Sequence, residues 1–259
     1  EIGSGLVGSE MCIRDRVCAG AKAVGGRRQP GQVGVAVILS HFDLEKPIEL
    51  NSSVVNVLVV ENETKFFDFC KEFAVQSKGG DGGFALFDEN EKLSVARDVK
   101  FVYDFFDVNF GDRRAQNGLI CCLEQIAESS LAAEYADLTE AVFSFLEKLN
   151  GETDFSIEFN SDGNLASLLK AYGVRWQEGF GGLLEALVSL IHFNARILKT
   201  KCFVFVNLKC FLNEDDLKRL YFEARLEDVC LFLLENSLKN KWDGEFVTVI
   251  DKDLCEIVV

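Results

Sequence analysis

Proline, histidine and positive charge are scarce in this sequence. Its 259 residues include two prolines and two histidines, and 27 lysines and arginines stand against 42 acidic residues, a formal net charge of −15. So few histidines exclude most histidine-based catalysis and most zinc sites. The acidic balance argues against nucleic acid as a partner, unless the few basic residues gather on one surface. No apolar run approaches the roughly 20 residues that cross a bilayer, so we expect no membrane partner.

Two kinds of site motif are also missing. The nine cysteines form no C-x-x-C pair and no zinc-type spacing with histidine, so we interpret them as reduced thiols in the core of a cytoplasmic protein. The string G-x-x-x-x-G-K-[ST], whose backbone N–H groups cradle nucleotide phosphates, does not occur. Glycines at 79–83 precede a strand and indicate a connection. Glycines at 179–182 would offer N–H groups to an anion, although a plain helix start is favoured.

Residues 1–33 differ in character from the rest of the chain. They show no helical period, no strand alternation and no apolar core of a secretory signal. Within them, residues 6–16 (LVGSEMCIRDR) resemble the in-frame translation of a sequencing adapter. We therefore expect 1–33 to be a non-native, disordered leader and the native protein to start between Val33 and Val37. The leader holds five basic and three acidic residues, so the remainder carries a net charge of −17.

The segment 201–236 gives the clearest indication of fold. Its run 202–206 is short, apolar and rich in aromatic and β-branched residues, which is typical of a strand buried on both faces. Asn213, followed by three acidic residues, indicates a helix start, and a second buried run follows at 229–234. Strand, helix and strand in about 35 residues predict a βαβ crossover and hence a parallel sheet.

Other segments extend this sheet. Strands are predicted at 35–42, 45–50, 54–60, 84–88, 245–250 and 255–259. Pro47 restricts the second of these to an edge or a turn. Asn62 is predicted to cap a helix with an aromatic face, and 95–106 is predicted to be helical. The fold class is therefore α/β, with a mostly parallel sheet in a head domain that spans 34–110 and 200–259.

Between 111 and 199 the pattern becomes helical. Apolar or small residues recur at intervals of three and four from 119 to 149, without proline, which predicts one helix of roughly 50 Å. A shorter helix at 164–172 and a nearly wholly apolar helix at 183–198 follow. We expect the first and last of these helices to lie antiparallel. The range 111–199 is thus predicted to be an α-helical arm domain inserted into the head.

The order of these pieces resembles the subtype II-A CRISPR-associated accessory proteins of the Csn type. The resemblance spans about 37–259 and depends on the colinear order of loose apolar motifs with a few polar anchors. These motifs are EKPIEL at 45–50, VLVVEN at 57–62, GFALFD at 83–88, LLKAYGV at 168–174, FVFVN at 203–207 and FLLEN at 232–236.

The resemblance implies a head related to ATPase heads but lacking the P-loop, without bound nucleotide and without enzyme activity. It further implies a homotetrameric ring with a basic channel that threads double-stranded DNA from its ends during spacer acquisition. Calcium ions would steady the arm and the ring. The implied partners are DNA ends, other copies of the chain, the CRISPR integrase complex and the RNA-guided nuclease.

DNA-end binding requires lysines and arginines that point into one channel and neutralise phosphates without reading bases. Four copies of a few such residues would make a positive channel inside an acidic shell. A solvated surface position is the competing interpretation for each candidate. The candidates are the basic residues that cluster in the sequence: Lys92, Arg97, Lys100, Arg113, Arg114, Lys170, Arg175, Arg196, Lys199 and Lys201.

Calcium requires oxygen ligands that are crowded on a turn. The candidates lie between the predicted arm helices, where the resembled family has an acidic segment: Glu152, Asp154, Glu158, Asn160 and Asp162. Asn160 and Ser161 stand where more carboxylates would be expected, and the spacing is not that of an EF-hand.

Two other functions remain open at this point. The first is a degenerate ATPase-like enzyme that binds nucleotide, although Asn207 stands where a metal-holding aspartate would follow a buried strand. The second is a protein-interaction module that uses the arm and does not bind DNA. The oligomeric state separates the ring from the module, because a channel requires several subunits.

Overall fold

The computed structural model describes residues 37–88, 91–108, 113–160, 164–176 and 180–259. These residues fall into two compact units. The sheet unit contains the described residues up to 108 and from 180 onward, and the helical unit contains 113–176. The expected leader, 1–33, lies outside the described residues.

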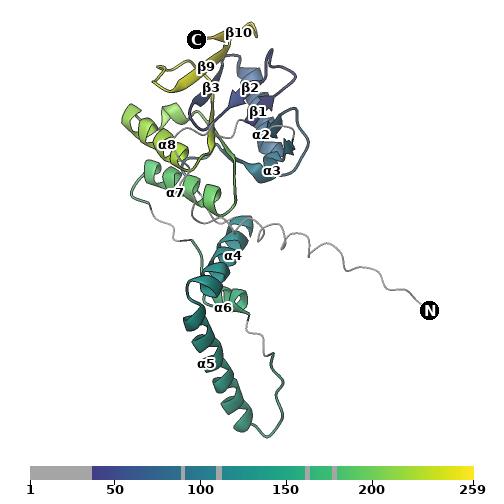
Figure 1. Cartoon of the computed structure of the whole chain (residues 1–259). Coiled ribbons are helices and arrows are strands. Elements are labelled where there is room, and N and C mark those ends of the chain that lie inside the picture. The colour runs from purple at the N-terminus through teal and green to yellow at the C-terminus, as the bar shows by residue number, and fades with distance from the viewer. Residues whose placement is uncertain (1–36, 89–90, 109–112, 161–163, 177–179) are drawn as a thin grey trace, which may run out of the picture. The chain divides into compact units, whose positions relative to one another are not determined.

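The sheet unit is built on a six-stranded sheet in the order β10-β9-β3-β8-β7-β6. Its strands are β3 (Val55–Val60), β6 (Val99–Val102), β7 (Cys202–Val206), β8 (Cys230–Glu235), β9 (Glu245–Ile250) and β10 (Glu256–Val258). All neighbours are parallel except β10, which pairs antiparallel with β9 at one edge (Figure 1). The predicted α/β fold with a mostly parallel sheet is confirmed.

The predicted βαβ crossover is also present. Strand β7 continues through the short 3-10 helix η2 (Leu208–Cys210) and helix α8 (Glu214–Leu226) to its parallel neighbour β8. The side chain of Asn213 accepts a hydrogen bond from the backbone N–H of Asp216 at 2.9 Å. Helix α8 therefore begins with the side-chain cap that the sequence indicated.

A second, antiparallel sheet in the same unit was not expected as a separate sheet. Its strand order is β2-β1-β4-β5. The strands are β1 (Val37–Ser40), β2 (Ile48–Leu50), β4 (Ala85–Asp88) and β5 (Glu91–Leu93). Strand β2 follows Pro47 and lies at the edge, as Pro47 predicted. Helix α2 (Glu63–Gln76) begins at Asn62, whose side chain accepts from the N–H of Lys65 at 3.0 Å.

The core of the sheet unit lies on both faces of the large sheet, since alternate residues of a strand point to opposite faces. On one face, Leu58 and Phe232 join Phe69 of α2 and residues of the small sheet in one buried cluster. On the other face, Leu233 is fully buried where α8 contacts β8. Helix α7 (Leu183–Arg196) packs along α8 (Figure 1). The central strands are therefore covered twice, which explains their continuous apolar runs.

Two predicted helices end earlier than their sequence patterns indicated. Helix α3 (Val95–Asp98) has a single turn, and β6 then pairs with β7, so the predicted helix at 95–106 is wrong. The predicted 50 Å helix is also wrong, because α4 (Arg113–Ser129) and α5 (Ala132–Gly151) are separate. At the break, Leu131 has non-helical angles (φ −123°, ψ 30°), and the Ser129 hydroxyl donates to the carbonyl of Gln125 at 2.6 Å. Hydroxyl groups bonded to a helix carbonyl often bend helices.

The helical unit consists of α4, α5 and α6 (Leu165–Ala171), with α4 in contact with both of the others. Helix α7, which sequence analysis placed in the arm at 111–199, lies in the sheet unit instead. The reason is its apolar surface, which is buried along α8. None of the described helices is long and apolar enough to span a membrane.

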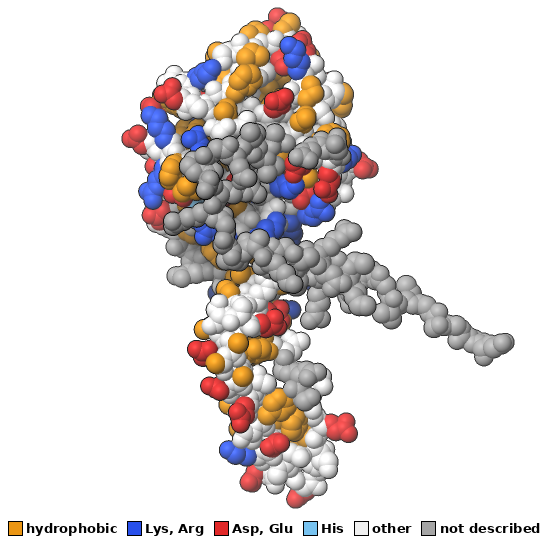
Figure 2. Space-filling model, viewed as in Figure 1, with side chains coloured by type: hydrophobic (Ala, Val, Ile, Leu, Met, Phe, Trp, Pro, Cys, Tyr) orange, Lys and Arg blue, Asp and Glu red, His pale blue; other side chains and the backbone are white. Residues whose placement is uncertain are grey.

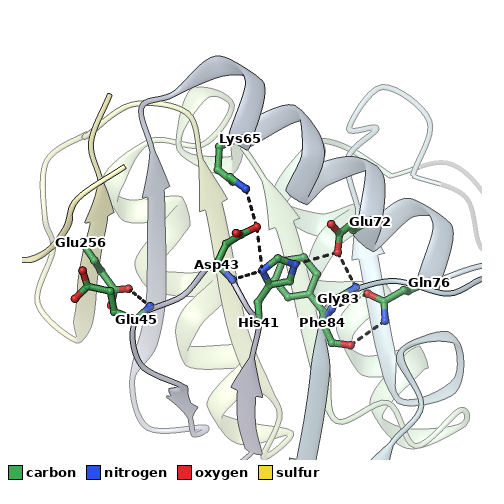
Figure 3. A network of polar contacts seen from close by, with 9 residues as sticks. All are labelled: His41, Asp43, Glu45, Lys65, Glu72, Gln76, Gly83, Phe84 and Glu256. Carbon is green, nitrogen blue, oxygen red and sulfur yellow. Dashed lines mark hydrogen bonds and ion pairs between the residues drawn. The ribbon is translucent and has the colours of Figure 1, made fainter. Parts of the chain in front are cut away.

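His41 joins the end of β1 to α2 (Figure 3). Its Nδ1 accepts a hydrogen bond from the backbone N–H of Asp43 at 3.1 Å, so Nε2 carries the proton and donates it to Glu72 at 3.0 Å. The same carboxylate oxygen accepts from the backbone N–H of Gly83 at 2.7 Å. The ring packs against Phe84, with centroids 4.5 Å apart. Both ring nitrogens are therefore engaged in holding the fold.

Gly83→Ala tests this close packing. A methyl group at Gly83 would overlap Nε2 of His41 and lie 2.7 Å from the ring of Phe42. We expect a loss of about 1–3 kcal/mol in the free energy of unfolding, because the His41–Glu72 bond must shift. Chemical denaturation measures this loss. Gly182→Ser is the control, since no atom lies within 4 Å of its added Cβ. Equal stability of the two variants would contradict the prediction.

Candidate nucleic-acid interface

The first group of predicted basic residues gathers where β6 and β7 begin. These strands are parallel with Val99 opposite Cys202, and the backbone N–H of Lys201 donates to the carbonyl of Asp98 at 2.9 Å. Segments 91–100 and 196–201, which are distant in sequence, therefore meet at the amino edge of the sheet. We call the following residues the amino-edge cluster: Lys92, Arg97, Lys100, Arg196, Lys199 and Lys201.

Acidic side chains neutralise both arginines of the amino-edge cluster. Arg97 binds Asp98 through two hydrogen bonds of 2.9 Å, and this contact raises the pKa of Arg97. Arg196, at the end of α7, binds Glu227 with its Nε and a terminal nitrogen, which likewise raises the pKa of Arg196. An arginine that is held by a bidentate carboxylate contact has less of its charge available to a phosphate.

The lysines of the amino-edge cluster differ in availability. Lys201 forms an ion pair with Asp88 of β4, and Lys100 is half-buried. Lys92 and Lys199 are exposed and form no ion pair with any described residue. Lys199 sits in the left-handed region (φ 56°), in the turn after α7. The open positive charge of this cluster therefore comes mainly from Lys92 and Lys199.

The second group gathers in the helical unit. Arg113 and Arg114 form the first turn of α4, and Gln116 donates to the carbonyl of Val174 at 2.6 Å. This bond holds Arg175 near the start of α4. We call the four exposed basic residues of this region the arm-base cluster: Arg113, Arg114, Lys170 and Arg175.

The first turn of α4 contains no acidic residue, and its two arginines stand at the end of the helix that carries partial positive charge. Arg114 has an interaction partner within the protein, and Asp112 directly precedes Arg113 in the sequence. The helix start by itself therefore does not indicate a bound anion.

Both signs of charge are mixed elsewhere on the surface. On the face seen in Figure 2, lysines and arginines of the sheet unit stand among acidic and apolar side chains, and the helical unit shows acidic and apolar side chains with a few basic ones. The sheet unit and the helical unit therefore each offer one local basic cluster.

The four predicted calcium residues that the structure describes are not grouped into a metal site. Glu152 follows α5 directly, and Glu152, Asp154, Glu158 and Asn160 are all exposed, whereas Asp162 lies outside the described residues. No three His, Cys, Asp or Glu side chains of the described chain are grouped to hold a metal ion. Calcium binding stays a prediction.

Two positions that were considered for nucleotide chemistry have structural roles. The N–H of Gly181 donates to the Glu185 carboxylate of the same helix at 3.0 Å, so a side chain already takes the place of an anion there. Asn207 adopts the left-handed region (φ 54°) and accepts from the N–H of Asn236 at 2.9 Å. It therefore links the ends of β7 and β8.

A buried polar cluster on the α8 face of the sheet was missed by sequence analysis. Lys209 forms an ion pair with Glu245 at 2.7 Å, and the hydroxyl of Tyr221 donates to the other oxygen of Glu245 at 2.8 Å. The backbone N–H of Lys209 donates to Glu235 at 3.1 Å. The sequence signal was Glu235 itself, a carboxylate that directly follows the apolar run 229–234.

Glu235 is the most unusual member of this cluster. Its side chain is fully buried, and its Oε2 has no hydrogen-bond partner among the described residues. Burial raises the pKa of Glu235 to about 7, against the opposing effect of Lys209. The group therefore holds a proton in the folded protein at pH values where an exposed glutamate is ionised.

Glu235→Gln tests this assignment. The unfolded chain loses the Glu235 proton near pH 4.5 and the folded chain near pH 7, so the contribution of Glu235 to stability falls as pH rises between these values. We expect the variant to match the wild type at pH 4.5 and to exceed it above pH 7 by up to about 3 kcal/mol.

Urea unfolding at several pH values measures the difference. The exposed Glu49→Gln serves as the control, and its difference from the wild type should not follow this pH course. An advantage of Glu235→Gln that is constant with pH would contradict the assignment.

A family model and a curated relative both point to one family. A family model described as CRISPR-associated protein (Cas_Csn2) matches residues 77–254, more than half of the chain. CRISPR-associated protein Csn2 of Enterococcus faecalis is 23% identical over 212 residues, which cover 77% of this chain and 90% of that protein. The crystal structure of Stu0660 of Streptococcus thermophilus is similar with a TM-score of 0.53 and 14% identity, over 83% of this chain and 75% of that one. At that identity the structural likeness supports the fold alone.

Proposed function

Because the chain belongs to the Csn2 family of CRISPR-associated proteins, we propose that it binds the ends of double-stranded DNA during spacer acquisition, without acting as an enzyme. The binding form is a homotetrameric ring, in which the basic clusters of four subunits line one channel. The CRISPR integrase complex and the RNA-guided nuclease are its further partners, and calcium steadies the assembly.

The gathering of basic residues in an acidic chain is the observation that carries the DNA-binding part. Ten candidates from four stretches of the sequence form two clusters, one at the amino edge of the sheet and one at the start of α4. Lys92, Lys199 and Arg175 are exposed and make no ion pair with a described residue. Such side chains neutralise phosphates without reading sequence. Repetition by symmetry would multiply their effect inside a channel.

A role without catalysis is supported by the surroundings of His41, Asn207 and Cys230. His41 uses both ring nitrogens within the fold, one toward Asp43 and one toward Glu72, so neither nitrogen is free to activate a nucleophile. The position that corresponds to a metal-holding aspartate is Asn207, which joins two strand ends. Burial raises the pKa of Cys230 to about 12, which keeps that thiol protonated and unreactive at neutral pH.

DNA topology provides the first test of the ring. We expect gel shifts with linear duplex and little binding to closed circles of the same length, because a ring can be entered only from an end. Binding should weaken steeply as salt rises, with a negative slope of log affinity against log salt. Light scattering on the same sample gives the number of subunits.

Equal affinity for linear and circular DNA would contradict threading. A protein that stays monomeric and does not bind either form would favour the alternative of an interaction module.

Lys92→Ala/Lys199→Ala tests the amino-edge cluster. We expect affinity for linear duplex to fall by about tenfold or more at about 0.1 M salt, and the salt slope to become less steep, because phosphate contacts are lost. The control is Lys46→Ala/Lys252→Ala, which removes the same charge from exposed positions outside the cluster. Lys252 follows the carboxyl end of β9, at the opposite edge of the sheet.

An equal loss of affinity in both double variants would mean that net charge alone matters. That result would remove the amino-edge cluster from the interface and leave the arm-base cluster as the remaining candidate.

A further inference from the structure

A pocket of about 340 Å³ lies between helix α2 and the loop that follows β1. The α2 residues that line it are spaced by three, four and three positions, which places them on one side of the helix: Lys65, Asp68, Glu72 and Val75. Phe42 and Asp43 line it from the loop, and Asp81 lines it from the segment before β4. Figure 3 shows Lys65 and Glu72 on the side of α2 that faces Asp43 and His41. We call this cavity the α2 pocket.

Phe42 forms an exposed aromatic wall of the α2 pocket. It is 78% exposed, although its ring packs on the ring of His41 with centroids 4.2 Å apart. A Cβ atom added at Gly83 would lie 2.7 Å from the ring of Phe42, so the backbone of Gly83 supports the ring as well. The protein therefore holds the ring in place while most of its surface stays open. The face of an exposed aromatic ring attracts cations.

Acidic side chains outnumber basic ones in the α2 pocket by four to two. Asp43 and Lys65 form an ion pair of 2.6 Å, which uses one side chain of each sign. The remaining carboxylates are Asp68, Glu72 and Asp81, and the remaining lysine is Lys71. The pocket therefore keeps a net negative charge after its internal ion pair is formed.

The three remaining carboxylates have oxygen atoms that can still accept hydrogen bonds. Asp68 and Asp81 form no hydrogen bond or ion pair with any residue that the structure describes. Glu72 accepts its bonds from His41 and Gly83 on Oε2 alone. Asp68 and Glu72 are four positions apart on α2, where like charges repel each other. A cation bound between them would offset this repulsion.

A single metal ion does not suit this arrangement. Among the described residues, no three His, Cys, Asp or Glu side chains are grouped to hold one. The carboxylates of the α2 pocket are instead distributed over two segments, with Asp68 and Glu72 on α2 and Asp81 on the segment before β4. An organic cation with several hydrogen-bond donors can reach carboxylates that are spread in this way.

We infer that the α2 pocket binds an arginine side chain that is presented by a segment of a partner protein. The guanidinium group is planar, carries five N–H donors and stacks on aromatic faces. It would stack on Phe42 and donate to the carboxylates of α2. Its carbon stem would lie against Val75, which is 41% exposed. A lysine ammonium would reach the same carboxylates, but as a point charge it gains less from the ring.

The size and surroundings of the α2 pocket select a protein as the source of this side chain. Small-molecule sites measure about 300–1,000 Å³, so a pocket at the lower end of that range accommodates one long side chain. Arginine is enriched at protein interfaces and among the residues that dominate their affinity. Phe67 lies one turn before Lys71 on α2 and is 62% exposed. It offers an apolar contact beside the pocket to the rest of the segment.

The peptide acetyl-Gly-Arg-Gly-amide serves as the probe, with the full chain as the receptor. Saturation-transfer NMR detects weak binding, and a titration gives the dissociation constant. We expect saturable binding that weakens as salt rises. The same peptide with citrulline, an uncharged analogue of arginine, should bind at least about fivefold more weakly. The lysine peptide should also bind more weakly than the arginine peptide.

Asp68→Asn/Asp81→Asn removes two open carboxylates with little change of shape. We expect the affinity for the arginine peptide to fall at least about threefold. Asp243→Asn/Asp253→Asn is the matched control, because it makes the same charge change at two exposed positions outside the pocket. It should leave the affinity unchanged. Equal losses in both double variants would mean that net charge alone attracts the peptide, and would overturn the inference.

Phe42→Leu tests the aromatic wall. The variant keeps an apolar side chain but removes the ring, so we expect the affinity for the arginine peptide to fall about two- to fivefold. The preference for arginine over lysine should shrink at the same time. Urea unfolding checks that the variant remains folded. An unchanged preference in a folded variant would contradict stacking on Phe42.

Two further outcomes would overturn the inference. One is a citrulline peptide that binds as tightly as the arginine peptide. The other is tighter binding of spermidine, because a free polyamine would then be the better occupant. The result is separable from the DNA experiments, since none of the ten basic candidates lines the α2 pocket. DNA-end binding can fail while arginine binding persists, and the reverse also holds.

Discussion

Burial of the central parallel strands on both faces is the constraint on which the sheet unit depends. Strands β3, β7 and β8 have almost no polar side chain to offer to water, so each face needs a covering layer. Helix α2 and the small antiparallel sheet provide one layer, and α7 and α8 provide the other. This requirement explains why α7 lies with the sheet although it follows the arm helices in sequence. The described part of the helical unit contains no such strands, and none of the residues of α5 is buried.

Positive charge is used sparingly in this acidic chain. Lys209 is almost fully buried between the sheet and α8, where it forms an ion pair with Glu245. At the amino edge of the sheet, carboxylates form ion pairs with Arg97, Arg196 and Lys201. A few exposed lysines and arginines then carry whatever charge is available to an external anion. In the proposed ring, symmetry would concentrate positive charge, since each subunit would bring its few open basic residues to one axis.

The exposed lysines where β7 begins have no ion-pair partner among the described residues. In the proposed ring, phosphate groups of DNA would supply that partner. The buried polar cluster around Glu235 is different, because it is internal and links folding to pH through a proton instead of through a partner.

Sequence patterns predicted the features that depend on local chemistry. The strand run at 202–206, the caps at Asn62 and Asn213, and the edge position after Pro47 each follow from residue type and neighbours. The α/β class and the βαβ crossover follow from their order. The helix predicted at 95–106 failed because pairing of Val99–Val102 with β7 outweighed a weak helical pattern. No proline or glycine marks the break at Leu131. The helical period alone therefore predicted one continuous helix there.

The sequence by itself determined which segments are buried, where most helices and strands begin, and which ten basic residues were worth considering. Only the tertiary structure decided which of those basic residues remain open, because ion pairs such as Lys201–Asp88 join residues more than a hundred positions apart. It also decided that burial raises the pKa of Glu235 and that no residue of α5 is buried. Burial and pairing between residues so far apart in sequence depend on the tertiary path of the chain. No local pattern of residues encodes that path.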